Sequence, residues 1–243
     1  MSFNKTFNYS PNFDEKKRDS KKIKFLIFHY TGMEKESEAI NRLTDVKSEV
    51  SSHYLIKNNG EIIAMIPGSY VAWHAGKSSW GKHKSLNKNS IGIEITNPGH
   101  EFKYKKFSKR QITSLLRLSI FLIKKYKIDI KNILGHSDIA PERKKDPGEK
   151  FPWKYLSQNQ VGLWHKIKKK DLLKNRKVKT TNIDKRLFFN NLFKIGYSKN
   201  MSKKNYLYCL TKTFQRRFRQ ALIDGKIDKE CVLISQNLSK RFQ

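Results

Sequence analysis

The chain has 243 residues, of which 37% are hydrophobic and 12% are aromatic, so it can build a core, and wholesale disorder is excluded. Its longest apolar stretch, residues 118–123, is far shorter than the roughly 18 residues that cross a bilayer, which excludes a transmembrane protein. Lys and Arg outnumber Asp and Glu by 52 to 21, a formal net charge of +31. This charge favours an anionic partner, either nucleic acid or a cell envelope, although a lysine-rich codon bias would produce it too.

The charge is denser toward the C-terminus. Residues 165–243 carry 22 basic and 5 acidic side chains, against 30 and 16 in the first 164 residues. Cys209 and Cys231 are the two cysteines, and both stand among apolar neighbours. We expect buried free thiols, and a disulfide between them stays open. With no Cys-x-x-Cys pair, any bound metal must be held by histidines and carboxylates.

The first elements in chain order are an arm, a strand and a helix. Residues 1–20 are polar and aperiodic, which predicts an N-terminal arm. The apolar run at residues 23–28 ends in His29 before a Thr-Gly turn, and it predicts a buried strand that delivers this histidine to a sheet edge. Residues 35–50 predict a polar helix.

A hairpin follows. Residues 53–57 and 61–66 flank an Asn-Asn-Gly turn, and these turn residues tolerate positive φ. Residues 70–74 predict a short strand. A polar loop over 76–90 leads to a buried strand at 90–96.

Ser108, with Gln111 three residues on, forms a capping box that opens an amphipathic helix over residues 109–126. Residues 132–136 predict another short strand that ends in a histidine. Strands interspersed with helices indicate an α/β fold with a central mixed sheet flanked by helices.

After residue 165 the composition changes. Residues 166–182 predict a basic linker or exposed helix, and they contain the stretch KIKKKDLLKNRKVK. Helical patterns then cover 183–195, 206–218 and 228–242, which indicates a small three-helix unit. The sequence thus predicts an arm over residues 1–20, a catalytic domain over 21–165, a linker over 166–182 and a helical domain over 183–243. We expect the helical domain to fold as a separate unit.

Three residues form a candidate metal site. His29 and His136 each end a predicted buried strand, and Asp146 follows ten residues after the second histidine. A zinc site for hydrolysis needs three N or O ligands from the protein and an open position for water. These three side chains supply that set.

At these residues the sequence resembles the zinc-dependent N-acetylmuramoyl-L-alanine amidases of the type 2 amidase family, which share a fold with peptidoglycan-recognition proteins. The matching segments are FHYTG (28–32), SSHYLIKNNGEI (51–62), AWHAGKSSW (72–80), SIGIEITN (90–97) and GHSDIAPERKKDPGEKFPW (135–153). Near the C-terminus, FNNLFKIGY (189–197) and TFQRRFRQALIDGKID (213–228) resemble the peptidoglycan-binding domain often appended to these enzymes.

The resemblance implies one zinc ion per chain, held by His29, His136 and Asp146. It implies that Glu94 accepts and returns the proton and that Lys144 stabilises the oxyanion. Lys144 precedes Asp146 by two residues, so in an extended chain both face one cleft. Some phage relatives carry a catalytic Tyr where this chain has Ser52, which puts a Tyr role in doubt.

Substrate contacts are expected from the same motifs. The candidates are His53, Trp73, His74, Trp80, Asn97 and Arg143. Simple packing is an equal explanation for His53. The side chains of Arg143 and Lys145 are expected to point away from that of Lys144.

The implied activity is hydrolysis of the amide bond between N-acetylmuramic acid, or its 1,6-anhydro form, and L-alanine of the peptidoglycan stem, in wall turnover or recycling. Two other functions compete: a recognition module that binds peptidoglycan without cutting, and a basic nucleic-acid-binding protein, for which no motif is present. We expect a monomer with no specific nucleic-acid partner. The N-terminus has no apolar export signal or lipid-attachment cysteine, which predicts a cytoplasmic location, whereas a wall-binding domain favours the periplasm or envelope.

Overall fold

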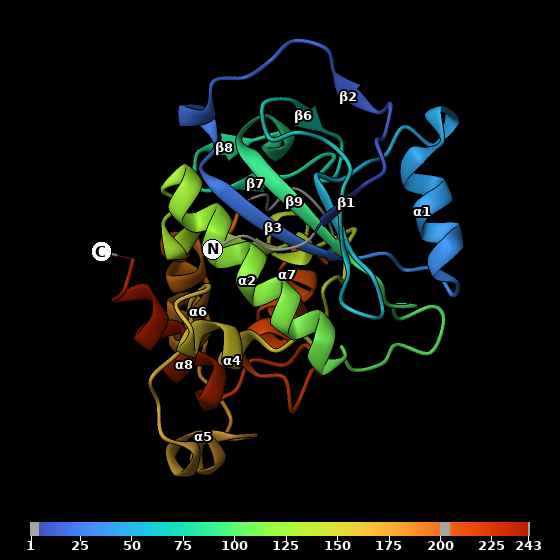
Figure 1. Ribbon diagram of the computed structural model, residues 1–243. Helices are drawn as coiled ribbons and strands as arrows, with labels where there is room; N and C mark the ends of the chain where they lie inside the picture. Colours follow the sequence, from blue (N-terminus) through green and yellow to red (C-terminus); the bar gives the residue numbers. More distant parts are fainter. Residues whose placement is uncertain (1–4, 200–204, 243) are drawn as a thin grey trace.

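The structure is a computed structural model that describes residues 5–199 and 205–242. Residues 1–4, 200–204 and 243, which belong to the predicted arm and helical domain, lie outside the described residues. Its centre is a six-stranded sheet in the order β1-β5-β4-β9-β3-β10 (Figure 1). The strands are β1 (Lys5–Phe7), β3 (Phe25–Tyr30), β4 (Tyr54–Ile56), β5 (Ile62–Ala64), β9 (Ser90–Ile95) and β10 (Ile133–Gly135).

The sheet is mixed, as the sequence predicted. β4 and β5 are the antiparallel pair, joined by the predicted Asn-Asn-Gly turn. The other neighbours, β1 with β5, β4 with β9, β9 with β3 and β3 with β10, are parallel. Gly60 in the hairpin turn has φ +87°, and a Cβ there would lie 2.9 Å from the carbonyl oxygen of Arg110. Glycine is therefore required at this turn.

The central strand β3 is buried on both faces, which is why it reads as an uninterrupted apolar run. Leu26 and Phe28 join the core beneath α2 (Lys109–Tyr126). The predicted capping box is present at the start of α2: the Ser108 hydroxyl accepts the Gln111 N–H at 3.2 Å, and the Gln111 side chain accepts the Ser108 N–H at 2.9 Å. The predicted amphipathic helix is confirmed.

The opposite face of the sheet carries the C-terminal helices. α6 (Asn182–Ile195), α7 (Tyr206–Phe218) and α8 (Lys229–Ser239) follow the three predicted helical patterns closely. Phe25 and Ile27 from β3 share one hydrophobic cluster with Phe188 and Phe214 from these helices. Since alternate residues of β3 enter the cluster under α2 and the cluster with the three helices, α2 and these helices lie on opposite faces of the sheet. Figure 1 shows α2 in the foreground, with α6 and α7 behind it. The division at residues 166–182 stays a prediction, but the described helices and the sheet have a common core.

The remaining elements connect these layers. The other α-helices are α1 (Glu36–Thr44), α3 (His136–Ile139), α4 (Trp153–Gln158) and α5 (Lys169–Asn175). Two small antiparallel pairs are β2 (Phe13–Asp14) with β6 (Val71–Ala72), and β7 (Ser79–Trp80) with β8 (His83–Lys84). The 3-10 turns are Ser20–Lys22, Val46–Ser48, Leu86–Asn89 and Ile130–Asn132.

The structure differs from the sequence prediction at several places. The loop predicted over 76–90 contains the short strands β7 and β8, and the segment 166–182, predicted as a linker or exposed helix, contains α5. The N-terminal arm contributes β1 to the sheet edge. The three residues of β1 are exposed, so no apolar pattern in the sequence predicts the strand. The helix predicted over 35–50 ends at Thr44. The prediction that His136 ends a strand is wrong by one residue, because β10 ends at Gly135 and His136 begins α3.

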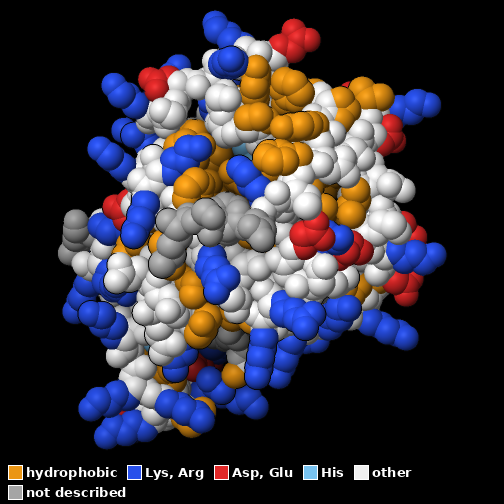
Figure 2. Space-filling view, viewed as in Figure 1, with side chains coloured by type: hydrophobic (Ala, Val, Ile, Leu, Met, Phe, Trp, Pro, Cys, Tyr) orange, Lys and Arg blue, Asp and Glu red, His pale blue; other side chains and the backbone are white. Residues whose placement is uncertain are grey.

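Basic side chains dominate the surface. Figure 2 shows Lys and Arg spread over the face in view and dense at the bottom, where Figure 1 places α5. Among the described residues no helix combines the length and apolarity that a membrane span requires. Cys209 and Cys231 are free, as expected, but only Cys231 is buried, and Cys209 is half-buried.

Candidate metal centre and active site

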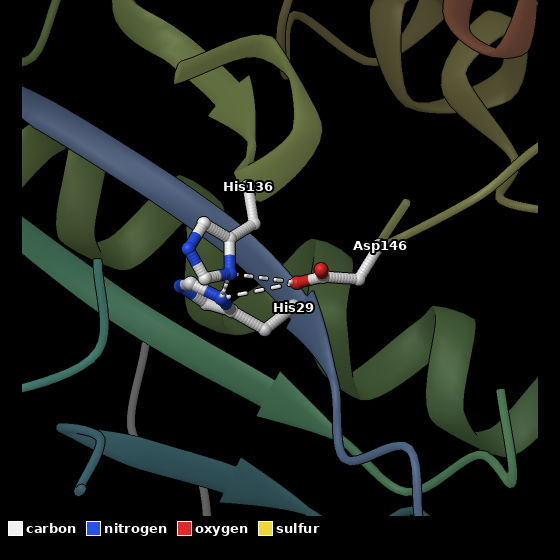
Figure 3. A group of neighbouring side chains, drawn as sticks. All are labelled: His29, His136 and Asp146. Atoms are coloured by element: carbon white, nitrogen blue, oxygen red, sulfur yellow. Dashed lines mark hydrogen bonds and ion pairs between the residues drawn. The ribbon is translucent and has the colours of Figure 1, made fainter. Parts of the chain in front are cut away.

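Two adjacent parallel strands bring the candidate metal ligands together. His29 lies near the end of β3, and His136 follows β10 directly. Gly135 of β10 pairs in register with Phe28 of β3, and each of these residues is followed by one of the two histidines. Asp146 reaches the same point from the loop after α3 (Figure 3).

The three ligand atoms form a compact triangle. His29 Nδ1 and His136 Nδ1 are 2.9 Å apart, and Asp146 Oδ2 lies 3.2 Å from the first and 3.1 Å from the second. All three side chains are buried. In a tetrahedral zinc site with bonds of 2.0 to 2.1 Å, ligand atoms lie about 3.3 Å apart. The donor set and its spacing therefore fit one zinc ion.

Electrostatics hold these side chains in their metal-binding forms. Burial, and then the charge of His136, lowers the pKa of His29 to about 4. Burial alone would raise the pKa of Asp146, but the charge of His136 and hydrogen bonds from both histidines hold it well below its usual range. At neutral pH the site thus offers a neutral imidazole at His29 and a carboxylate at Asp146, as metal binding requires.

A hydrogen-bonded chain continues from His29 away from the ligand triangle. His29 Nε2 lies 3.0 Å from His74 Nδ1, and His74 Nε2 lies 3.1 Å from Ser90 Oγ, which donates to the Leu86 carbonyl at 2.6 Å. When Nδ1 of His29 binds a metal, the proton of the imidazole ring is on Nε2. Each group in this hydrogen-bonded series then donates to the next. Gly92 makes room for the ring, since a Cβ there would lie 2.4 Å from His74 Cγ.

The ring of His136 is oriented in a similar way. Its Nε2 lies 3.2 Å from the carbonyl oxygen of Ala75, which accepts the proton when Nδ1 faces a metal. Both histidine ligands therefore have a partner for the second ring nitrogen, and such partners fix the tautomer and orientation of zinc-binding histidines. The sequence did not predict that His74 contacts a ligand.

The ligand triangle opens onto a cavity of about 460 Å³. The cavity is lined by Tyr30, Thr31, Gly32, Met33, Ala39, Arg42, Leu43, Val50, Ser51, Trp73, His74, Glu94, Pro98, Gly99, His100, Glu101, His136, Arg143, Lys144, Lys145 and Asp146. Lys144 and Asp146 share this cavity, as their spacing predicted. Arg143 and Lys145 line it as well, although they were expected to point away from Lys144. The Arg143 guanidinium donates to the Lys77 carbonyl at 2.6 Å.

Glu94 lines the cavity beside the metal ligands. It is the register partner of His29 on the neighbouring strand, so the two side chains project from the same face of the sheet. Its Oε2 is buried and has no hydrogen-bond partner among the described residues. Burial raises the pKa of Glu94 to about 8; the charge of Asp146 adds to the rise, and Lys144 opposes it. A carboxyl group that titrates near neutral pH suits general acid–base work.

Three of the expected substrate contacts lie outside the cavity lining. His53 is fully buried and accepts the Gly92 N–H at 3.0 Å. The Asn97 side chain holds the following loop, with its amide donating to the Lys105 carbonyl at 2.9 Å. Trp80 packs edge-on against Tyr197, with ring centroids 4.7 Å apart. These three residues therefore pack and hydrogen-bond within the fold. Of the two tryptophans expected to contact substrate, Trp73 lines the cavity and Trp80 does not.

The cavity also contains a residue that the sequence did not single out. His100 Nδ1 lies 2.9 Å from the Tyr30 hydroxyl, and its Nε2 lies 3.0 Å from Glu149. Its ring stacks on Tyr104 with centroids 4.4 Å apart. A lone histidine in a loop carries no sequence signal for such a position.

Comparisons with known proteins find similar amidases. Residues 19–149 match the model of the N-acetylmuramoyl-L-alanine amidase family. The chain is 34% identical over 235 residues to the N-acetylmuramoyl-L-alanine amidase AmiD of Escherichia coli, covering 91% of this chain and 84% of AmiD. It is 33% identical to the 1,6-anhydro-N-acetylmuramyl-L-alanine amidase AmpD of Haemophilus influenzae, covering 61% of this chain and 88% of AmpD.

Solved structures are similar over the whole chain. The complex of E. coli AmiD with anhydro-N-acetylmuramic acid-L-Ala-D-gamma-Glu-L-Lys has a TM-score of 0.80 at 32% identity and covers 90% of each chain. AmpDh3 of Pseudomonas aeruginosa in complex with an anhydromuramic pentapeptide has a TM-score of 0.79 at 28% identity, covering 100% of this chain and 98% of that one. The similarity includes the C-terminal helices as well as the sheet.

Proposed function

The chain belongs to the N-acetylmuramoyl-L-alanine amidase family, and from this premise we propose that it cleaves the amide bond between N-acetylmuramic acid, or its 1,6-anhydro form, and L-alanine of the stem peptide. The observation that carries the proposal is the buried triangle of His29, His136 and Asp146 beside a cavity that His136 and Asp146 line. The ligands named in the AmiD and AmpDh3 complexes, an anhydromuramyl tripeptide and pentapeptide, support a muropeptide substrate.

We propose that the triangle holds one zinc ion. Two imidazoles and a carboxylate are a common protein donor set for catalytic zinc, which keeps a further position free for water. When bound, zinc supplies Lewis-acid activation of water and of the scissile carbonyl. The remaining steps belong to side chains of this protein.

Glu94 moves the proton. Its carboxylate faces the cavity from the strand beside His29, where it accepts a proton from the attacking water and returns it to the amine of the leaving L-alanine. Lys144 places a positive charge in the same cavity, where it stabilises the oxyanion of the tetrahedral intermediate.

The C-terminal helices are proposed to bind peptidoglycan. They carry a hollow of about 590 Å³ lined by apolar and basic side chains: Lys179, Thr180, Lys185, Phe189, Leu207, Tyr208, Thr211, Gly225, Lys226 and Ile227. Apolar rings with lysines around them suit a sugar face and stem carboxylates. Contact with the wall would place the protein in the envelope, whereas the cytoplasmic location expected from the N-terminus stays a prediction, as does the monomeric state.

Mass spectrometry of digests tests the proposal. Purified protein should contain about one zinc per chain and should release peptides that begin with L-alanine from an anhydromuramyl tripeptide and from sacculi. A chelator should abolish release, and added zinc should restore it. His136→Ala should lose metal and activity, while His83→Ala, a histidine outside the cavity lining, should keep both.

Two outcomes contradict the proposal. Full turnover in chelator would remove zinc from the mechanism. Tight binding of the tripeptide by the zinc-loaded protein without cleavage would identify a recognition module instead.

A further inference from the structure

A buried carboxylate that the mechanism does not use lies two residues after the ligand His136. Asp138 belongs to the same short helix, α3, and is 2% exposed. It lines neither the catalytic cavity nor the hollow on the C-terminal helices. A buried charge is costly unless it is paired, so its partners indicate what it stabilises.

Asp138 shapes the turn that presents His136. Its Oδ2 accepts the backbone N–H of Gly135 at 2.8 Å, and Gly135 is the last residue of β10, directly before the ligand. A Cβ at Gly135 would lie 2.5 Å from Pro147 Cδ, so the Asp146–Pro147 segment packs closely against this turn. The orientation of the turn therefore affects two metal ligands, His136 and Asp146.

The remaining partners of Asp138 come from the C-terminal helices. Arg217 on α7 forms an ion pair with Oδ2, and its other terminal nitrogen donates to the Ile133 carbonyl at 2.9 Å. Tyr197, after α6, donates its hydroxyl to Oδ1 at 2.7 Å. The guanidinium of Arg217 also lies over the Trp153 ring, 4.2 Å from its centroid. Two side chains distant in sequence thus hold both oxygens of one carboxylate.

A neighbouring arginine shows that this contact is specific. Arg219, two residues on, is also buried, but its ion pairs go to Asp224 and Asp228 in the segment between α7 and α8 and to Glu230 on α8. Arg219 therefore stabilises the helices internally. Arg217 instead joins them to the turn that carries a metal ligand.

We propose that Arg217 and Tyr197 are positioning residues for the metal centre. They act through Asp138 to hold the turn of His136, so the C-terminal helices set the affinity of the catalytic domain for its metal. The inference deepens the proposed function and rests on zinc binding to His29, His136 and Asp146. Partners beyond the direct ligands change zinc affinity by about 10- to 100-fold, and this contact, which acts through the backbone, should lie near tenfold.

The test compares Arg217→Met and Tyr197→Phe with the matched control Arg219→Met in the full-length protein. Zinc affinity is measured by competition with a chromophoric chelator, and thermal unfolding of the metal-free proteins is recorded beside it. We expect about tenfold weaker zinc binding in Arg217→Met, and a smaller loss in Tyr197→Phe, whose ring still packs on Trp80. Arg219→Met should unfold at lower temperature but bind zinc as tightly as the unchanged protein.

A second readout needs no metal. In the metal-free proteins, amide hydrogen exchange of residues 133–140 should be faster in Arg217→Met and Tyr197→Phe than in Arg219→Met. If Arg217→Met does not fold, Tyr197→Phe decides, because it removes one hydroxyl and keeps the ring.

The outcomes separate the two proposals. Unchanged zinc affinity in both folded variants, or an equal loss in Arg219→Met, overturns the positioning role. If the unchanged protein binds no zinc, the proposed function fails, and unaltered exchange at residues 133–140 then overturns the positioning of the turn as well.

Discussion

Removal of residues 180–243 should unfold the rest of the chain rather than release an intact catalytic domain. The C-terminal helices cover one face of the central sheet, and the side chains beneath them form part of a shared hydrophobic cluster. Without the helices this face of the sheet would meet water. The predicted outcome follows from the amount of apolar surface that would be exposed.

The free-energy cost of exposing this face follows from four side chains on the sheet side of the cluster. Phe25, Ile27, Leu134 and Ile139 are between 0% and 1% exposed. Burying one such side chain contributes about 1.5 to 3 kcal/mol, so exposing all four would cost on the order of 6 to 12 kcal/mol. This matches the whole unfolding free energy of a typical domain, about 5 to 15 kcal/mol.

Circular dichroism and calorimetry of the truncated protein provide the assay. The shortened chain should show no cooperative thermal transition, whereas the full chain should unfold in one. Phe214→Ala in the full chain gives a graded version: the Phe214 ring is fully buried in the shared cluster, and its removal should cost about 3 to 5 kcal/mol. That loss should lower the single transition of the whole molecule.

A truncated chain that melts cooperatively and still cleaves a small muropeptide would refute this reasoning. It would also support the division into two independent units that the composition change at residues 166–182 predicted. Two separate transitions in the full chain, with Phe214→Ala lowering only one of them, would point the same way.

Four further predictions concern the site and the charge. Glu94→Gln should keep zinc, measured by elemental analysis, while kcat falls by about 10²-fold or more; full activity would remove Glu94 from the proton transfer. His74→Phe should weaken zinc binding by about 10- to 100-fold in chelator competition, because His29 loses its partner; unaltered affinity would show that packing alone orients His29. Burial, and then the charge of Arg18, lowers the pKa of His53 to about 3, so the folded protein binds fewer protons than the unfolded chain below pH 6.5. His53 should therefore lower the free energy of unfolding by about 3 kcal/mol between pH 7 and pH 4. The urea midpoint of His53→Gln should depend less steeply on pH than that of the unchanged protein. Binding to sacculi should weaken steeply as salt is raised, with little change in turnover of a soluble muropeptide, since surface charges are screened beyond about 8 Å at physiological salt; binding indifferent to salt would mean that the +31 charge takes no part.

Local sequence was sufficient for the elements with a strong pattern. The apolar run before His29 predicted β3, and the pair Ser108 and Gln111 predicted the start of α2. These features depend on neighbours within a few residues, so they can be read without knowledge of the fold. β1 could not be predicted in this way, because its residues are exposed and only the partner strand makes it a strand.

The sequence by itself predicted the donor set of the candidate metal site. Histidines at the ends of apolar runs, an aspartate ten residues after the second, and the family resemblance predicted His29, His136 and Asp146 as one group, and the adjacent parallel strands β3 and β10 bring them together. Only the tertiary structure decided what supports that group. The contacts of His74 with His29, and of Arg217 with Asp138, join residues 45 and 79 positions apart. Such contacts leave no periodicity or spacing in the sequence, because each depends on how separate elements pack on one face of the sheet.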